Sequence, residues 1–179
     1  MSPTRSRQGR LQELLSQFSS KDSVLITIWA DPDALASALA LKRLLWRKVQ
    51  SLTIAHLNAI KRFDNLTMIR LLKIPLVRLH KVDGSSFSKI VLVDGQPEHN
   101  EAFADFDYDV VIDHHPRTTS LRVPFLDIRP NYGAVASMMT EYLRAARIRP
   151  SKSLATALLF AIRVDTGNFE SGVAEEDIK

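Results

Sequence analysis

The residues best suited to chemistry lie at the end of a short apolar run in the second half of the chain. The run Val110-Val111-Ile112 leads directly into Asp113, His114 and His115, and Pro116 then stops any strand ladder. Carboxylates and imidazoles bind divalent cations and also exchange protons. A strand that is buried on both faces would hold these groups rigidly at its carboxyl end.

Further acids follow other apolar segments. Asp31 and Asp33 come just after the first apolar run, Asp94 follows the fourth, and Asp165 lies beside a Thr-Gly pair at the end of a long apolar helix pattern. In a parallel sheet the carboxyl ends of all strands lie at one edge, and ligands bind there. We therefore expect these acids to meet at one edge of the sheet.

Each acid also has a structural explanation when it is taken alone. An aspartate after a strand commonly forms a turn or caps a helix, and Asp33 is well placed to cap the segment that follows it. Carboxylates that crowd together repel one another and raise each other's pKa, so bound cations explain a cluster better. Carboxylate and imidazole ligands without thiolate predict one or two ions of Mn²⁺ or Mg²⁺ rather than Zn²⁺.

The elements that must position these residues follow from the hydrophobic pattern. Strands are expected over 23–29, 51–56, 75–79, 90–93, 110–112 and 125–128, and helices over 34–49, 62–72, 133–147 and 151–163. Residues 81–88 are expected to form a loop, and residues 97–106 an irregular or weakly helical segment. Strands that alternate with helices predict an α/β fold, with a mostly parallel Rossmann-like sheet flanked by helices.

The two ends of the chain are more polar than its centre. Residues 1–20 are expected to form a basic, solvated arm (Arg5, Arg7 and Arg10) and a short amphipathic helix, before a main domain over residues 21–179. The charged tail over residues 174–179 has no terminating element. We therefore expect the chain to be part of a longer protein.

Composition limits the classes of protein to consider. The 179 residues include no cysteine, which excludes disulfides, thiolate metal sites and a cysteine nucleophile. The lack of cysteine also fits a reducing compartment, so a cytoplasmic location is expected. The apolar runs are shorter than the roughly 18 residues that span a bilayer, so we expect no membrane partner. The net charge of +4 is compatible with an acidic or phosphorylated ligand.

Four segments resemble, in order and spacing, the motifs of the DHH phosphoesterase superfamily. They are Asp31-Pro32-Asp33-Ala34-Leu35-Ala36-Ser37, Val91-Leu92-Val93-Asp94, Asp113-His114-His115 and Asp165-Thr166-Gly167-Asn168-Phe169. The pattern is most similar to the branch of oligoribonucleases and 3′-phosphoadenosine 5′-phosphate phosphatases. The resemblance covers residues 23–169, which is most of the chain.

The resemblance implies a Rossmann-like catalytic domain that uses two metal ions, usually Mn²⁺. Asp31 would hold one ion, Asp33 the other, and Asp94 would bridge both. His114 and Asp165 would complete the shell of the second ion.

The same resemblance implies a hydrolase that cleaves phosphodiester or phosphomonoester bonds in small nucleotides or short oligonucleotides. His115 would lie near the scissile phosphate as a hydrogen-bond donor or general acid, and Asp113 would orient the loop. Family members bind substrate between this domain and a smaller C-terminal substrate-binding domain, which we expect in the full-length protein. Exposed edges of such a sheet also make a homodimer an expected partner arrangement.

The first motif departs from the family pattern. Thr27, or Trp29 if a two-residue gap is allowed, stands where the family has its first metal-binding histidine. Candidates to replace that histidine are His56, His80 and His99. Two alternatives to the enzyme therefore remain. One is a degenerate DHH domain with an impaired metal site, acting as a nucleotide-binding or regulatory module, and the other is a structural domain with chance acids.

Overall fold

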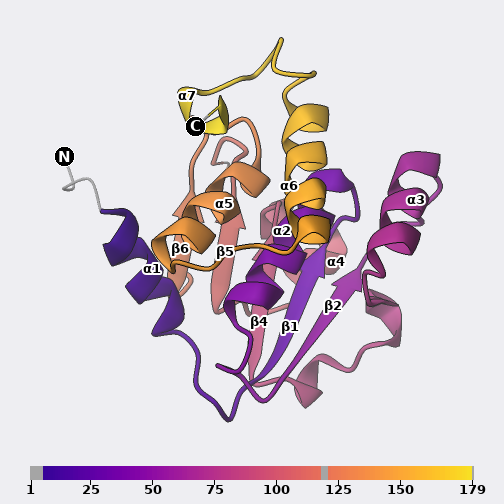
Figure 1. Ribbon diagram of the computed structural model, residues 1–179. Helices are drawn as coiled ribbons and strands as arrows, with labels where there is room; N and C mark the ends of the chain where they lie inside the picture. Colours follow the sequence, from indigo (N-terminus) through magenta and orange to yellow (C-terminus); the bar gives the residue numbers. More distant parts are fainter. Residues whose placement is uncertain (1–5, 118–120, 179) are drawn as a thin grey trace.

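The computed structural model describes residues 6–117 and 121–178, which fold around one six-stranded sheet (Figure 1). The strands are β1 Ser23–Ile28, β2 Ser51–His56, β3 Leu76–Arg78, β4 Lys89–Val93, β5 Val110–Asp113 and β6 Phe125–Ile128. Every neighbouring pair is parallel, and the order across the sheet is β3-β2-β1-β4-β5-β6. The predicted α/β fold is therefore confirmed, with a topological switch point between β1 and β4.

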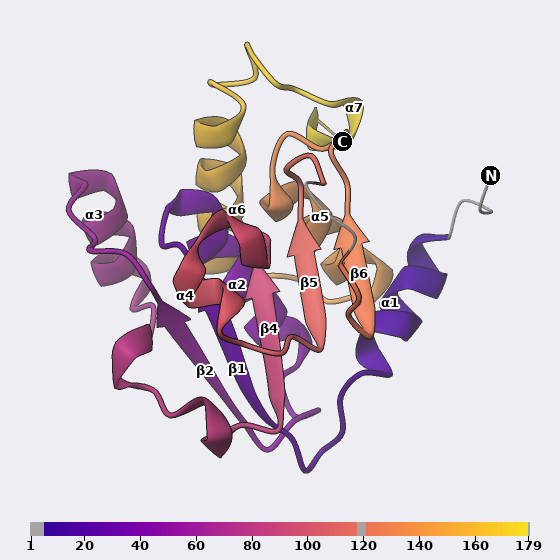
Figure 2. The ribbon, with the colours of Figure 1, turned by 180° about the vertical axis from the view of Figure 1, so that it is seen from behind.

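Helices cover both faces of the sheet. They are α1 Arg7–Leu15, α2 Pro32–Leu44, α3 Phe63–Leu72, α4 Glu101–Ala104, α5 Val135–Ala145, α6 Lys152–Asp165 and α7 Glu175–Ile178. Three short 3₁₀ turns connect other elements: η1 Leu79–Lys81, η2 Gly84–Ser86 and η3 Pro97–His99. The larger core lies under α1, α2, α3, α5 and α6, and α4 covers the opposite face (Figure 2).

The central strands are apolar throughout because both of their faces are buried. In β1, Ile26 and Ile28 face the larger core, whereas Leu25 faces the smaller core beside Leu92 of β4 and Phe103 of α4. Burial on both sides fixes the register of these strands, so their carboxyl ends are held rigidly at one edge.

The structure changes several predicted boundaries. The first long helix ends at Leu44, earlier than the predicted 49, and the last long helix extends through Asp165. Ser151 caps that last helix, since its hydroxyl accepts a hydrogen bond from the Leu154 amide. The tail, which was expected to have no terminating element, contains the short helix α7, and its Asp177 side chain accepts a hydrogen bond from the Gly133 amide.

The basic arm is also different from the prediction. Arg7 and Arg10 belong to α1 and form ion pairs with Glu141 of α5 at 2.8 and 3.3 Å, so they are not part of a solvated tail. Leu11 and Leu14 of the same helix lie in the larger core. Arg5 lies outside the described residues. Among the residues that the structure describes, no helix is both long and apolar enough to cross a bilayer.

A substitution at Gly133 tests how tightly the C-terminal segment packs on the loop before α5. An added Cβ there would come within 2.5 Å of the Gly172 carbonyl oxygen and 2.7 Å of Cγ2 of Thr166. Because a backbone atom cannot move aside as a flexible side chain can, Gly133→Ala is expected to lower the free energy of unfolding by about 1–3 kcal/mol. Urea denaturation measures this change. Gly95→Ala is the control, since its nearest neighbour would be at 3.8 Å and only a small effect is expected.

Candidate metal centre

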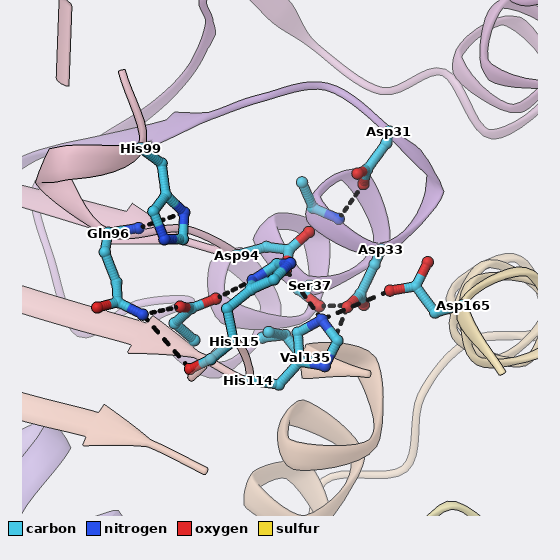
Figure 3. Close-up of polar contacts among 12 residues, drawn as sticks. Asp31, Asp33, Ser37, Asp94, Gln96, His99, His114, His115, Val135 and Asp165 are labelled. Atoms are coloured by element: carbon cyan, nitrogen blue, oxygen red, sulfur yellow. Dashed lines mark hydrogen bonds and ion pairs between the residues drawn. The ribbon is translucent and has the colours of Figure 1, made fainter. Parts of the chain in front are cut away.

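Most of the predicted site residues meet at the carboxyl edge of the sheet, at the switch point between β1 and β4 (Figure 3). Asp31 and Asp33 start α2, Asp94 directly follows β4, His114 and His115 follow β5, and Asp165 ends α6. The structure thus brings together side chains from four segments that are far apart in the sequence.

Asp94 lies at the centre of this group. It is the first residue beyond β4, and its backbone adopts φ +60°, a left-handed conformation that aspartate and asparagine tolerate better than most residues. Its side chain is buried, and Oδ1 has no hydrogen-bond partner among the described residues. This oxygen lies 3.7 Å from Nε2 of His114 and 4.0 Å from Nδ1 of His115. A buried and unpaired carboxylate oxygen beside two imidazoles is well suited to a cation.

The ring of His114 is oriented for metal binding. Its Nδ1 lies 3.1 Å from the backbone carbonyl oxygen of Tyr132, an acceptor, so Nδ1 carries the proton. The lone pair of Nε2 then faces Oδ1 of Asp94 and, at 3.6 Å, Oδ2 of Asp165. Metal-binding histidines are commonly fixed by such a contact of the second ring nitrogen.

Asp33 links the centre to α5. Its Oδ2 accepts a hydrogen bond from the Val135 amide at 2.6 Å, and its Oδ1 accepts one from the Ala136 amide at 2.7 Å. The Asp33 carboxyl therefore satisfies two of the free amides at the start of this helix. It is also hydrogen-bonded to the carboxyl group of Asp165 (Figure 3), which requires a shared proton in the metal-free protein. A cation between the two groups would take the place of that proton.

Asp31 caps α2, because its Oδ1 accepts a hydrogen bond from the Ala34 amide at 2.9 Å. The residue before it, Ala30, is held on both sides of its peptide. Its N–H donates to Oδ1 of Asn58, and its carbonyl accepts from the side-chain amides of Asn58 and Asn65. The loop that carries Asp31 is therefore fixed by side chains from the segment after β2.

The pKa values of all four acids in the centre are raised. Burial, followed by the charges of Asp33 and Asp31, raises the pKa of Asp94 well above its usual range. Burial and Asp165 do the same to the pKa of Asp33. Burial is also the main reason why the pKa values of Asp31 and Asp165 are raised. A group of ionised carboxylates is therefore costly in the metal-free protein, and a divalent cation would remove that cost.

Asp113 and His115 form a separate pair beside the cluster. Nδ1 of His115 donates to Oδ1 of Asp113 at 2.8 Å, and Nε2 of Gln96 donates to Oδ2 of Asp113 at 2.7 Å. Burial alone would raise the pKa of Asp113, but these two hydrogen bonds outweigh it and the pKa is lowered. The pKa of His115 is raised, mainly by the bond to Asp113. Asp113 therefore orients His115 and leaves its Nε2 available to a ligand.

This pair gives a direct prediction. Asp113→Asn keeps the shape of the side chain but removes the charge that stabilises the imidazolium of His115. We expect the pKa of His115 to fall, so this histidine loses its proton at a lower pH than in the wild type. An NMR titration of the His115 ring measures the shift, and His80, which is exposed on η1, is the internal reference. An unchanged titration of His115 would contradict the assigned hydrogen bond.

The donor set fits a hard or borderline divalent cation. Potential ligand atoms of Asp33, His114 and Asp165 lie within 4.8 Å of one another, and so do those of Asp94, His114 and His115, so that His114 belongs to both groups. Oxygen and imidazole ligands suit Mn²⁺ and Mg²⁺. The buried, unpaired Oδ1 of Asp94 is the observation that favours a bound ion over a simple acid cluster.

The two residues that align with the family's first metal-binding histidine are not members of this cluster of acids and histidines. Thr27 is completely buried, with its hydroxyl 3.3 Å from the Val91 carbonyl oxygen and 3.4 Å from the hydroxyl of Tyr108. Trp29 is exposed at the edge. Of the candidate histidines, His99 lies beside His115, with the ring centroids 5.4 Å apart. His56 contacts the Asn58 carbonyl oxygen through Nδ1.

Several supporting residues carry no signal in the sequence. The side-chain amide of Gln96 contacts Asp113. The other contacts come from the backbone, namely from the carbonyl of Tyr132 and the amides of Val135 and Ala136. Backbone groups are present in every residue, so no pattern of residue types can identify them. Gln96 differs from these backbone groups, because its side chain is polar and it lies two residues after Asp94 in the sequence.

The comparison with protein families agrees with this geometry. The model of the DHH family, N-terminal domain, matches residues 23–162. The chain belongs to the DHH family. A curated relative in this comparison is an uncharacterized protein of Methanocaldococcus jannaschii, 36% identical over 156 residues, which make up 87% of this chain and 32% of that protein. The chain thus spans about a third of the length of this relative.

Two solved structures share the fold of this DHH domain. One is a putative family II inorganic pyrophosphatase of Methanococcus jannaschii, with a TM-score of 0.66 and 23% identity over 87% of this chain and 52% of the other. The second is an exopolyphosphatase-related protein from Bacteroides fragilis, with a TM-score of 0.70 and 18% identity over 96% of this chain and 54% of the other. At these identities the likeness concerns the fold.

Proposed function

We propose that this DHH domain is the metal-binding half of a phosphohydrolase that cleaves phosphodiester or phosphomonoester bonds in small nucleotides or short oligonucleotides. The observation that carries the proposal is the buried Oδ1 of Asp94, unpaired among the described residues and facing Nε2 of His114. We further propose one or two Mn²⁺ or Mg²⁺ ions and a substrate-binding domain outside this chain. The homodimer and the cytoplasmic location stay predictions.

Each residue of the centre has a task in this proposal. A divalent cation bound there would lower the pKa of a coordinated water and neutralise charge on a phosphoryl oxygen. One ion would be held by Asp31 and Asp94. The second ion would be held by Asp33, Asp94, His114 and Asp165. Tyr132 keeps His114 in the tautomer that can bind metal.

His115 would act on the substrate rather than on the metal. Its Nδ1 is committed to Asp113, so Nε2 is the atom that holds or donates a proton to a phosphoryl oxygen or a leaving group. The raised pKa of His115 favours the protonated form that such a donor requires.

Hydrolysis by the full-length protein tests the proposal. The substrates are short RNA, 3′-phosphoadenosine 5′-phosphate and a chromogenic phosphodiester, each with Mn²⁺, with Mg²⁺ and with a chelator. Pyrophosphate and polyphosphate belong in the same panel, because the two solved structures are a putative pyrophosphatase and an exopolyphosphatase-related protein. Metal-dependent turnover of at least one nucleotide substrate is expected. No turnover of any substrate with either metal would reject the enzyme.

A second candidate function is a nucleotide-binding or regulatory module with an impaired first metal site. The observation in its favour is Thr27, whose buried hydroxyl contacts Tyr108 where the family pattern has a metal-binding histidine. Metal binding by calorimetry without turnover would favour this module. In that case Thr27→His, combined with Tyr108→Phe to relieve crowding, is expected to raise both the affinity for Mn²⁺ and the hydrolytic rate.

A further inference from the structure

We propose that Trp29 is a stacking surface for the base of a nucleotide substrate, so that the site selects nucleotides over base-free phosphates. The inference rests on the proposed function, because it concerns the substrate of the same centre. Four observations support it: the position of Trp29, its exposure, the rigidity of its backbone and the chemistry of an indole ring.

Trp29 is placed at the mouth of the site. It is the first residue after β1, and it is followed two positions later by Asp31. β1 pairs with β4 up to Thr27 and Leu92, and Trp29 and Asp94 each come two residues after this last pair. These two strands form the topological switch point, where ligands of such sheets bind.

The indole of Trp29 is available to a ligand. The residue is 46% exposed, although the strand residues from Val24 to Ile28 before it and the helix start after it are largely buried. Within residues 6–117 and 121–178, none of the aromatic ring contacts involves it. An exposed indole of this kind can stack on an aromatic ring of a ligand.

The backbone around Trp29 is fixed on both sides. The Ile28 carbonyl accepts a hydrogen bond from the Leu57 amide at 3.0 Å. On the other side, Ala30 donates to Oδ1 of Asn58 at 2.7 Å, and its carbonyl accepts from Asn58 and Asn65 at 3.1 and 3.2 Å. Because these hydrogen bonds already hold the backbone on both sides of Trp29, little backbone freedom is lost when a ligand binds to its ring.

An indole ring stacks on the flat face of a base and does not distinguish one base from another. Stacking is tolerant of base identity, because every base has a π-face. A phosphate without a base gains nothing from this contact. Trp29 should therefore separate nucleotides from pyrophosphate, whereas the metal centre alone would accept the phosphoryl group of either.

Fluorescence gives a test of binding that needs no turnover. The chain has two tryptophans, and Trp46 follows α2 at the opposite, amino-terminal edge of the sheet. In the Trp46→Phe variant the emission comes from Trp29 alone. Adenosine 5′-monophosphate with Mg²⁺ is expected to quench it saturably, and pyrophosphate with Mg²⁺ is not. The Trp29→Phe variant, which reports Trp46, is the control and should respond to neither ligand.

Kinetics of the full-length enzyme give the second readout. Trp29→Ala is expected to raise KM for a dinucleotide by roughly 5- to 150-fold, the range of base stacking measured by alanine substitution. The inhibition constant of pyrophosphate and the affinity for Mn²⁺ should stay unchanged, and Trp29→Phe should retain most of the selectivity. Equal effects on dinucleotide and pyrophosphate, or no effect on either, would overturn the inference. Wild-type protein that quenches with nucleotide but turns over no substrate would reject the proposed hydrolysis and leave the stacking surface supported.

Discussion

Asp94→Asn is expected to remove metal binding while it makes the metal-free protein more resistant to unfolding. Asn keeps the shape of the side chain and tolerates the φ of +60° at this position, so the fold should be retained. The charge that attracts the cation is lost. Because the loss of an outer-shell partner alone costs about 10–100-fold in metal affinity, we expect a loss of more than about 100-fold here.

The gain in stability has an electrostatic cause. Asp94 is buried among Asp31, Asp33 and Asp165, whose charges all raise its pKa. Removing one charge relieves this repulsion in the metal-free state. Calorimetry with Mn²⁺ measures the affinity, and urea denaturation in a chelator measures the stability.

An exposed acid provides the control for Asp94. Asp107→Asn removes a charge from the loop before β5, where the side chain is exposed, and should change neither metal affinity nor stability measurably. If Asp94→Asn behaved like Asp107→Asn in the calorimeter, Asp94 would not be a metal ligand.

The stability of the metal-free protein is expected to rise as the solution is made mildly acidic. Burial raises the folded-state pKa values of the four clustered acids above the ordinary value of 3.8 (Asp31, Asp33, Asp94 and Asp165), and for Asp33, Asp94 and Asp165 the charges of neighbouring acids add to this effect. Between 3.8 and those raised values the folded state holds more protons than the unfolded state. Stability therefore falls as the pH rises through this window and returns as the pH is lowered.

Saturating Mn²⁺ should reverse this dependence. A cation binds the deprotonated carboxylates, so acidification from about pH 7 to about pH 5 weakens binding and lowers the stability of the metal-bound protein. Urea midpoints at both pH values, with Mn²⁺ and with a chelator, give the comparison. Midpoints that fall with acid in both conditions would show that the cluster does not control stability. Asp113 has a lowered pKa, so its contribution to stability is lost as the pH falls, but this loss occurs only below about pH 4.

The sheet and the site could be predicted from the sequence for the same physical reason. Strands buried on both faces are continuous apolar runs, and in a parallel sheet their carboxyl ends share one edge. Asp31, Asp94 and Asp113 each follow such a run, so their convergence followed from topology. The predicted carboxyl-terminal strand ends lie within one residue of the observed ones.

Helix ends and long-range polar contacts could not be predicted in this way. Asp165 was expected to lie beyond the last long helix, predicted over 151–163, but α6 continues through it. The bond from the Val135 amide to Asp33 joins residues 102 apart, and no local pattern encodes such a contact. Arg7 was assigned to a solvated arm because its partner, Glu141, is also distant in the sequence.

The hydrogen bonds between Asp33 and the first amides of α5 affect the order in which parts of the protein fold. During synthesis the sheet can begin to assemble from its first strands, but Asp33 cannot accept hydrogen bonds from the Val135 and Ala136 amides until these residues have left the ribosome. The proposed ligand set is complete only when Asp165 has followed. Contacts of such long sequence separation are entropically costly to close and form late. If the proposed metal binds, a nascent chain would therefore acquire it only after the strands of the sheet are made.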